Sequence, residues 1–374
     1  MSRRTLVVTN DFPPRAGGIQ AYVHKLVSLQ PAGSVVVYAS TSPGAAAFDA
    51  EQPFGVVRHR TGLLVPTPAA LRRAREVARA EGCTAVWFGA AAPLALLAPG
   101  LRTAGVERAV ASTHGHEVGW AVLPGARRAL RRIGSSVDVV TYLGEYTRTR
   151  LVPALGPAAR LERLPPGVDP EVFTPQVDGS AVRRRHLLGD RPTVVCVSRL
   201  VPRKGQDVLI RALPEVRRRV PGAALLIVGG GGDLPRLRRL ARSLDLDRDV
   251  VFTGAVPWAE LPEHYAAGHV FAMPCRTRRG GLDVEGLGLV YLEASATGLP
   301  VVAGDSGGAP DAVLDGETGY VLPGRSVDAV VDRVGRLLAD RDAARAMGEK
   351  GRAWVDREWR WDSLAARLGR FLRD

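Results

Sequence analysis

Cysteine and aromatic residues are scarce in this sequence, and their scarcity narrows the classes of protein that it can encode. The chain has 374 residues but only three cysteines, Cys83, Cys196 and Cys275, an odd number without the spacing of a metal cluster. This usage predicts free thiols in the reducing environment of the cytosol rather than a disulfide-linked scaffold. Aromatic residues make up 6% of the chain, and no base-stacking pattern accompanies the basic clusters. We therefore expect no nucleic-acid partner.

Long apolar runs are lacking as well. The longest uncharged run, residues 82–101, approaches the length of a membrane span, but two glycines and two prolines interrupt it. We read it as a strand, a loop and a short helix. The apolar run near the start of the chain is too short for a secretory signal and reads as a first strand. Any membrane contact is therefore expected to be peripheral.

The composition is that of a folded globular chain, with 46% apolar and 24% charged residues and enough length for two sizeable cores. The net charge of +13 is uneven, because residues 1–169 carry +9 and the remainder carries +4. This bias favours a phosphate-rich partner or an anionic membrane surface for the first half. A GC-rich genome also produces frequent Arg, Ala and Gly, so the charge alone leaves both explanations open.

The first half of the chain alternates β-branched apolar runs with helical patterns, which predicts a parallel sheet built from βαβ units. A helix is expected at Ile19–Gln30. The expected strands are Thr5–Thr9, Ser34–Ala39, Val56–Arg60, Thr84–Phe88, Arg108–Thr113, Val137–Leu143 and Leu161–Leu164. Turn-forming residues from Pro165 to Pro175 then mark a linker between domains.

A second series of the same kind follows the linker. Its expected strands are Thr193–Ser198, Ala223–Val228, Val250–Thr253, Val270–Met273 and Pro300–Ala303, with helices at Gly205–Val216, Asp233–Ser243, Pro257–Ala267, Leu289–Thr297 and through most of Ala329–Asp374. The sequence thus predicts an α/β chain with two doubly wound, Rossmann-like domains at 1–168 and 169–356 and a C-terminal helical segment at 357–374. In such sheets ligands bind at the carboxyl ends of the strands.

One stretch, from Cys275 to Ala294, has the pattern of a binding site. It holds two acids eight positions apart, Glu285 and Glu293, on either side of a Gly-rich turn. An apolar strand precedes the turn and a helix follows it. Backbone N–H groups at the start of a helix can face a bound anion, so we expect a small anionic substrate here.

Two other strand ends carry groups suited to phosphate. Arg199 and Lys204 follow the strand Thr193–Ser198 and precede a helix, which suits a pyrophosphate, although a solvated basic turn is the alternative. Gly17 and Gly18 stand at the first expected helix start of the chain, where the backbone can approach a phosphate closely, but a Gly-Gly pair is more often simply a turn.

The loop after the strand Arg108–Thr113 is dense in titratable groups. His114, His116 and Glu117 follow this apolar strand directly, which favours a functional loop over a structural one. A His-x-His pair can also bind a metal, but no third ligand stands at a familiar spacing. We expect no metal site.

Taken together, these segments resemble the retaining two-Rossmann-domain glycosyltransferases of the family that includes sucrose-phosphate synthases. The resemblance rests on the spacing of Glu285 and Glu293, the segment from Ser198 to Gly205, the linker from Pro166 to Pro175, and Gly17-Gly18. Four segments, Val7–Gln20, Val86–Ala95, Ala111–Trp120 and Gly280–Leu289, are similar more narrowly to the actinobacterial GDP-mannose-dependent phosphatidylinositol-monomannoside α-1,6-mannosyltransferases.

The resemblance implies the GT-B fold, with two domains facing across a cleft and a final helix, Trp361–Leu372, crossing back to the first domain. It implies retaining transfer of mannose from GDP-mannose to phosphatidylinositol monomannoside, giving the dimannoside, with no cofactor and no metal. Retention would come from front-face attack, with the leaving phosphate drawing the proton of the acceptor.

The resemblance also implies roles for single residues. His114, Glu285, Arg199 and Lys204 would act at the reacting centre, and Asp11 and His116 would contact the acceptor. The implied donor-binding residues are Gly17, Gly18, Arg199, Lys204, Gly254, Val256, Gly286, Leu287, Gly288 and Glu293.

A lipid acceptor would explain the positive charge of the first half of the chain. Two expected helices, Ala69–Ala80 and Gly125–Ile133, carry four arginines each. In the second helix the arginines recur in pairs at i and i+4 and leave Ala129, Leu130 and Ile133 on a different side. This pattern is suited to an anionic leaflet. The resemblance places the protein at the cytoplasmic face of the plasma membrane. A solvated basic face is the alternative.

Two other functions stay open. The first is a transferase of the same fold with a soluble acceptor, such as an inositol phosphate or a sugar phosphate. The second is a tandem-Rossmann isomerase or NAD-binding protein, but the first loop lacks the Gly-x-Gly-x-x-Gly pattern of a dinucleotide site.

Overall fold

The computed structural model describes residues 4–374, which form two compact units. One unit ends at Pro166 and also takes in Trp361–Asp374, and the other spans Gly167–Arg360. The division at 166/167 lies two residues before the boundary expected from the sequence. The final helix begins at Trp361, where the sequence placed its start, whereas the segment expected at 357–374 also takes in the end of a long helix of the second unit, which continues to Glu358.

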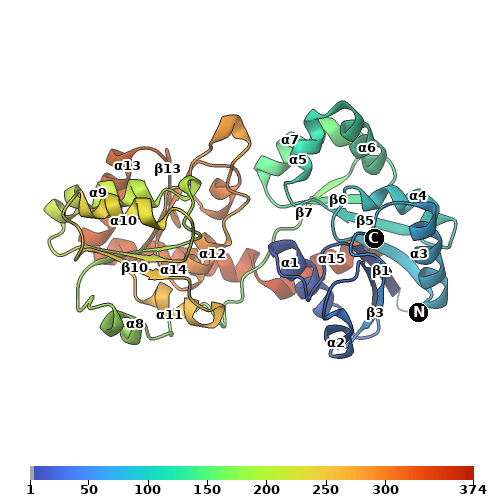
Figure 1. Ribbon diagram of the computed structural model, residues 1–374, viewed down its shortest axis with the longest axis horizontal. Coiled ribbons are helices and arrows are strands. Elements are labelled where there is room, and N and C mark those ends of the chain that lie inside the picture. The colour runs from blue at the N-terminus through green and yellow to red at the C-terminus, as the bar shows by residue number, and fades with distance from the viewer. Residues whose placement is uncertain (1–3) are drawn as a thin grey trace. The chain divides into compact units, whose positions relative to one another are not determined.

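The first unit is built on a seven-stranded, wholly parallel sheet with strand order β3-β2-β1-β4-β5-β6-β7 (Figure 1). The strands are β1 (Arg4–Thr9), β2 (Val35–Ala39), β3 (Gly55–Arg58), β4 (Cys83–Phe88), β5 (Arg108–Ser112), β6 (Val139–Tyr142) and β7 (Leu161–Arg163). The order reverses between β1 and β4, so a topological switch point lies at the carboxyl ends of these two strands.

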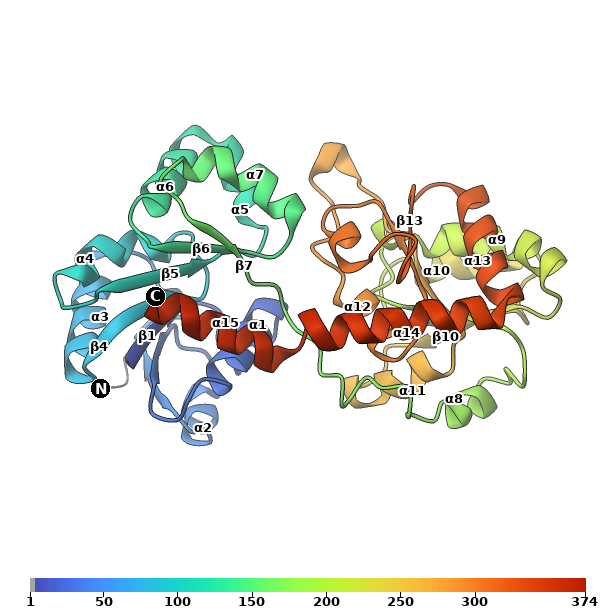
Figure 2. The ribbon, with the colours of Figure 1, turned by 180° about the vertical axis from the view of Figure 1, so that it is seen from behind.

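Helices of the first unit cover both faces of this sheet. They are α1 (Gly18–Ser28), α2 (Ala45–Ala50), α3 (Pro68–Ala80), η1 (Leu94–Leu97), α4 (Ala98–Arg102), α5 (Glu117–Val122), α6 (Pro124–Gly134), α7 (Glu145–Leu155) and α15 (Trp361–Arg373). On one face, Leu26 of α1 and Leu368 of α15 pack in a core with Val7 and Val110. Figure 2 shows α15 beside α1. The C-terminal helix therefore completes the core of the first unit.

The second unit contains a six-stranded parallel sheet with strand order β10-β9-β8-β11-β12-β13. The strands are β8 (Thr193–Val197), β9 (Ala224–Val228), β10 (Val250–Gly254), β11 (Val270–Met273), β12 (Val301–Gly304) and β13 (Gly319–Leu322). Its switch point lies between β8 and β11. The edge strand β13 was not expected from the sequence, because its run is only four residues long and begins with glycine.

The helices of the second unit are α8 (Ser180–Arg185), η2 (Pro202–Lys204), α9 (Gln206–Arg219), α10 (Leu234–Arg242), η3 (Trp258–Glu260), α11 (Leu261–Ala266), η4 (Arg279–Gly281), α12 (Leu289–Ala296), η5 (Ala309–Ala312), α13 (Val327–Ala339) and α14 (Arg341–Glu358). The single helix expected at Pro257–Ala267 is in fact a 3-10 turn followed by α11. The expected α/β class with two doubly wound parallel sheets is confirmed. Within residues 4–374, no helix is both long and apolar enough to cross a bilayer.

Candidate active site

The end of strand β8 supplies the most buried cation among the expected site residues. Lys204 is 8% exposed, and its Nζ lies 2.6 Å from Oε2 of Glu285, which is 6% exposed. The contact is an ion pair rather than a well-aligned hydrogen bond. Nε of Arg203 lies 3.8 Å from the same oxygen. The two residues that the sequence placed in one site are thus brought together.

Arg199 lies on the same loop but differs from Lys204 in its surroundings. Its side chain is exposed, and among residues 4–374 no acidic side chain pairs with it. A guanidinium that is not held by protein groups can bind a phosphate without first breaking an ion pair. Lys204 and Arg199 therefore offer one buried and one accessible cation at the same strand end.

A close approach of two backbones fixes Lys204. Gly205 follows it with φ 79°, and a Cβ there would lie 2.0 Å from the carbonyl oxygen of Pro274. Only glycine fits this position, since it tolerates both the left-handed conformation and the contact. The loop after β8 is in this way pressed against the segment that follows β11.

The loop of Glu285 is held by the segment that follows β12. Ser306 Oγ accepts the backbone N–H of Glu285 at 3.3 Å, and the N–H of Gly308 donates to the Glu285 carbonyl oxygen at 3.0 Å. A Cβ at Gly307 would lie 2.0 Å from that carbonyl. No local sequence pattern pointed to these partners, because they lie more than twenty residues further along the chain.

A hairpin, orange in Figure 1, stands between β11 and Glu285, and ion pairs fix its base. The backbones of Arg278 and Asp283 bond to each other, and Arg203 Nη1 lies 3.5 Å from the Asp283 carboxylate. Arg276 Nη2 donates to Asp207 Oδ1 at 2.8 Å. Burial alone would raise the pKa of Asp207, but hydrogen bonds from Arg276 and Arg211 outweigh it and hold the pKa below its ordinary value.

Glu293 lies on α12, which begins after Gly288 in the left-handed conformation, φ 80°. Its Oε2 accepts a hydrogen bond from the Tyr265 hydroxyl at 2.7 Å. Burial raises the pKa of Glu293, and the Tyr265 hydrogen bond lowers it only in part. Gly286 is exposed, while Leu287 is 5% exposed and packs in the core. The Gly-rich turn therefore directly precedes the predicted helix, and Glu293 lies within that helix.

The other expected donor-binding residues of this unit follow β10. Gly254 ends that strand with φ 77°, and its carbonyl oxygen accepts the N–H of Gly229 at 2.9 Å. Val256 is partly buried against the core. A Cβ at Gly229 would meet the Ser198 carbonyl oxygen at 2.1 Å, so this Gly-rich turn is needed for backbone packing. The candidate residues of the second unit thus lie at the carboxyl ends of β8, β10 and β11.

In the first unit, His114 follows β5 and is held by a backbone carbonyl. Its Nε2 lies 2.6 Å from the carbonyl oxygen of Gly89, and since a carbonyl only accepts, Nε2 carries the proton. Burial lowers the pKa of His114 despite the nearby Glu117 carboxylate. The Tyr22 ring packs edge-on against it at 5.1 Å. His114 is therefore a neutral imidazole, and within the described residues its Nδ1 bonds to no protein group.

Glu117 organises the loop that carries His114. It is fully buried, and its Oε2 accepts the N–H groups of His114 at 3.0 Å and Gly115 at 3.1 Å. Nε2 of His116 lies 3.3 Å from Oε1 of the same carboxylate. The sequence singled out Glu117 as part of a polar cluster without a role of its own; the structure makes it the residue that positions the histidines.

The first loop of the chain meets these residues at the same sheet edge. Asp11 follows β1, and its Oδ1 accepts a hydrogen bond from Gln20 Nε2 at 2.9 Å. A Cβ at Gly17 would lie 2.1 Å from Gln20 Oε1, so a larger residue there would displace Gln20. Gly18 opens α1. No group of three His, Cys, Asp or Glu side chains within residues 4–374 could hold a metal ion.

The basic helices differ in part from what the sequence suggested. In α6, Leu130 and Ile133 are fully buried in the core of the first unit, so their side does not face a membrane, contrary to the expected pattern. The four arginines of α6 are exposed, and Val122 and Leu123, which directly precede α6 in the chain, are 77% and 60% exposed. The apolar groups near these arginines therefore come from the α5–α6 junction rather than from the helix itself.

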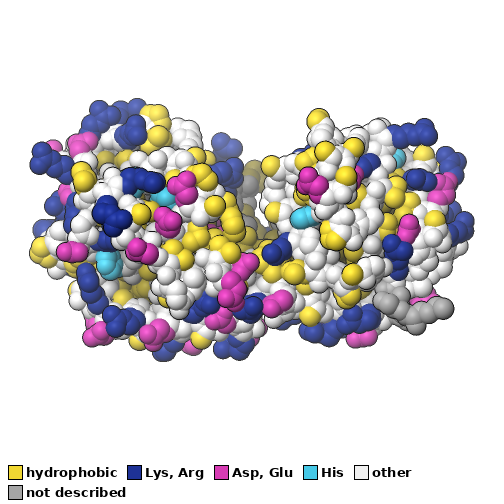
Figure 3. Space-filling view, turned by 90° about the horizontal axis from the view of Figure 1, so that it is seen from below, with side chains coloured by type: hydrophobic (Ala, Val, Ile, Leu, Met, Phe, Trp, Pro, Cys, Tyr) yellow, Lys and Arg dark blue, Asp and Glu magenta, His cyan; other side chains and the backbone are white. Residues whose placement is uncertain are grey.

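A basic hollow of about 490 Å³ lies between the end of β3 and α3. It is lined by Arg58, His59, Arg60, Ala69, Arg72, Arg73 and Glu76. The Arg58 guanidinium donates hydrogen bonds to the Asp49 carboxylate and to backbone carbonyl oxygens, and Arg73 forms an ion pair with Glu76. Figure 3 shows that Lys and Arg side chains are also spread over other parts of the surface, on both units.

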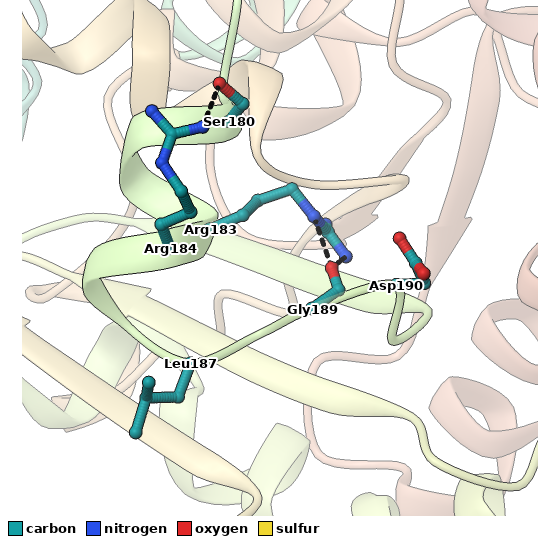
Figure 4. Close-up of a pocket in the computed structure, with 6 residues that line it drawn as sticks. All are labelled: Ser180, Arg183, Arg184, Leu187, Gly189 and Asp190. Atoms are coloured by element: carbon teal, nitrogen blue, oxygen red, sulfur yellow. Dashed lines mark hydrogen bonds between the residues drawn. The ribbon is translucent and has the colours of Figure 1, made fainter.

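An open hollow of about 590 Å³ lies beside α8, away from every expected site residue (Figure 4). Arg183 donates to the carbonyl oxygens of Gly189, Arg191 and Ala267, and Arg184 bonds to Ser180. These arginines support the local chain. The hollow is not a candidate active site.

Comparison with known proteins agrees with this architecture. A family model described as Glycosyltransferase Family 4 matches residues 16–172, and one described as Glycosyl transferases group 1 matches residues 180–354. Anabaena HepE in complex with UDP has a similar structure, with a TM-score of 0.79 at 18% identity over 99% of both chains. At this identity the likeness shows the fold alone.

Two curated relatives extend over nearly the whole chain. The GDP-mannose-dependent alpha-(1-6)-phosphatidylinositol monomannoside mannosyltransferase of Mycobacterium tuberculosis is 57% identical, covering 99% of this chain and 98% of that protein. The GDP-mannose-dependent monoacylated alpha-(1-6)-phosphatidylinositol monomannoside mannosyltransferase of Corynebacterium glutamicum is 48% identical, covering 100% and 98%. The chain is therefore a glycosyltransferase, and it belongs to the family that contains these mycobacterial and corynebacterial mannosyltransferases.

Proposed function

We propose that this chain transfers mannose, with retention, from GDP-mannose to phosphatidylinositol monomannoside, forming the α-1,6-linked dimannoside. The observation that carries the proposal is the high identity to the mycobacterial enzyme along the whole chain. The arrangement of Lys204, Glu285 and His114 supports it, because each stands at the carboxyl end of a parallel strand, where such sheets bind ligands.

Lys204 and Arg199 would neutralise the diphosphate of the donor. Negative charge grows on that group as the bond to the sugar breaks, so fixed cations there stabilise the transition state more than the bound substrate. Lys204 is nearly buried and preorganised, and Arg199 is exposed and able to close on the phosphate. When the diphosphate takes over Lys204, the Glu285 carboxylate becomes free to accept hydrogen bonds from sugar hydroxyls.

His114 would contact the mannose near its anomeric carbon. Because Nε2–H donates to the Gly89 carbonyl oxygen, the free Nδ1 lone pair can accept a hydrogen bond from a sugar hydroxyl. In the transfer step the C1–O bond to phosphate breaks and a bond from C1 to the acceptor oxygen forms on the same face. The acceptor proton passes to the departing phosphate oxygen, so no protein base is needed.

The lipid acceptor requires contact with a membrane, which we assign to the first unit at the cytoplasmic face of the plasma membrane. The exposed arginines of α6, with Val122 and Leu123 beside them, combine charge and apolar surface as interfacial segments do. The hollow at α3 adds Arg60 and Arg72 to the basic surface. Anionic lipids attract such segments.

The test is transfer of labelled mannose from GDP-mannose to vesicles that contain either phosphatidylinositol or its monomannoside, with inositol phosphate as a soluble third acceptor. We expect labelled dimannoside from the monomannoside alone. Lys204→Ala should abolish the product, whereas Lys350→Ala, which removes an exposed lysine of α14, should not. Turnover with inositol phosphate and none with the lipids would overturn the proposal.

A further inference from the structure

The carboxylate of Glu293 is held by one protein group only. Its Oε2 accepts the Tyr265 hydroxyl at 2.7 Å, and within residues 4–374 no Lys, Arg or His side chain bonds to either oxygen. This contrasts with Glu285, which is paired with Lys204 at 2.6 Å. A carboxylate in a partly buried place without a cation depends on its hydrogen-bond donors to stay ionised.

Tyr265 is well placed to act as that donor, because its ring is buried and packed among other aromatic rings. It is fully buried on α11, and it packs against Phe173 at 5.7 Å and against Phe271 of β11 at 5.7 Å. Trp258 packs edge-on against Phe173, with 5.8 Å between the ring centroids. The hydroxyl is therefore aimed at Glu293 by an aromatic cluster that joins the linker, the loop after β10 and β11.

The charged groups on neighbouring elements are engaged elsewhere. Arg352 of α14 donates to Asp356 and to the carbonyl oxygens of Pro170, Phe173 and Ala296. On α11, His264 Nδ1 bonds to the Glu260 carbonyl oxygen. Among the described residues, none of the other titratable side chains of α11 and α14, nor Asp311 on η5 or the buried Cys196 thiol on β8, forms a hydrogen bond or ion pair with the Glu293 carboxylate.

We propose that Tyr265 is a positioning residue of the donor site, which holds Oε2 of Glu293 so that the carboxylate presents its other lone pairs to a vicinal diol of the nucleotide ribose. A vicinal diol donates two hydrogen bonds, and an ionised, correctly turned carboxylate accepts both. Tyr265 uses one lone pair of Oε2 and leaves Oε1 without a protein partner among the described residues. This inference rests on the proposed function only in taking the ligand to be a nucleoside diphosphate sugar.

The role predicts a specific dependence on pH. The diol binds the ionised carboxylate, so affinity falls as the pH drops through the pKa of Glu293. Burial raises that pKa and the Tyr265 hydroxyl lowers it. Removing the hydroxyl therefore shifts the loss of affinity to a higher pH. A purely structural role of Tyr265 would change stability without moving this pH dependence.

The experiment measures the Kd of GDP by calorimetry between pH 5 and pH 8, with the full chain. Tyr265→Phe keeps the ring, and we expect it to weaken GDP binding about tenfold near neutral pH. We also expect it to shift the acid limb, the part of the pH profile in which affinity is lost as the pH falls, to higher pH. Tyr291→Phe is the matched control, because it removes a buried hydroxyl of the same unit that bonds to Met273 and Cys275 instead. It should leave the acid limb in place.

A second variant keeps the test decisive if Tyr265→Phe is unstable. The side chain in Glu293→Gln does not ionise, so this variant should bind GDP weakly and show no acid limb. Adding Tyr265→Phe to it should have little further effect on the Kd of GDP. An acid limb in Tyr265→Phe that coincides with the wild type would overturn the inference. A wild type that binds GDP but forms no dimannoside contradicts only the proposed function, whereas a wild type that does not bind GDP overturns both.

Discussion

Nζ of Lys204 lies 2.6 Å from Oε2 of Glu285, and less than a tenth of either residue is exposed. Lys204 lies in the segment that follows β8, and Glu285 lies in the loop that follows β11. The ion pair therefore connects the ends of two neighbouring strands of the sheet. Each neutralises the other, although we assign one to phosphate and the other to sugar. A buried charge that loses its partner strongly destabilises the folded state.

The first prediction follows from that pairing. Lys204→Met leaves the buried Glu285 carboxylate with only the more distant Arg203 guanidinium, at 3.8 Å, and Glu285→Gln leaves the buried Lys204 ammonium without its anion. We expect each to lower Tm by about 5–10 °C. The double variant removes both charges and should lose clearly less than the two single losses combined. Calorimetry of the four proteins tests this, and strictly additive changes would show that the two charges do not depend on each other.

The second prediction compares two glycines with the same backbone conformation. Gly205 has φ 79° and Gly222 has φ 80°, but a Cβ at Gly205 would lie 2.0 Å from the Pro274 carbonyl oxygen, while nothing lies within 4 Å of one at Gly222. Gly222→Ala should cost only about 1–2 kcal/mol, from the left-handed conformation. Gly205→Ala should cost more and also displace Lys204, so transferase kcat/KM should fall. Equal effects on Tm and activity would contradict the proposed contact.

The third prediction concerns Asp207, whose pKa is held below its ordinary value by Arg276 and Arg211. The ionised group stabilises the fold above about pH 4, and this stabilisation is lost as the pH falls through the lowered folded-state pKa. Asp207→Asn should therefore lower Tm at pH 7, and the difference from wild type should shrink below pH 4. Asp332→Asn, which removes a partly exposed carboxylate on α13 that pairs with the exposed Arg336, should change Tm little at either pH. A difference that does not depend on pH would mean that Asp207 acts by shape alone.

The alternation of apolar runs and helical patterns was enough to predict both parallel sheets, because buried parallel strands have a strong sequence signal. The strand β13 was missed since a four-residue edge strand beginning with Gly319 has almost none. The local pattern also placed Gly288 directly before a helix and Glu293 within that helix, where the structure has them.

Partners far along the chain could not be foreseen. Tyr265 and Glu293 are separated by 28 positions, and Asp207 and Arg276 by 69, so no local pattern connects either pair. A periodic pattern also indicates that a helix has an apolar side without saying what covers that side. For this reason the pattern of α6 was compatible with a membrane-facing helix, although Leu130 and Ile133 pack in the core of their own unit.

The last prediction separates charge on α6 from charge in general. Arg128 and Arg132 are exposed on α6, close to the exposed Val122 and Leu123, and Arg239 and Arg242 are exposed on α10 of the other unit. Reversing either pair to Glu changes the net charge equally. Since each basic residue near an anionic bilayer contributes about 1 kcal/mol, Arg128→Glu with Arg132→Glu should weaken binding to phosphatidylinositol vesicles at least about tenfold. The α10 pair should change it far less. Sedimentation with vesicles at low and high salt measures both, and equal losses would show that net charge, rather than α6, attracts the protein to the membrane.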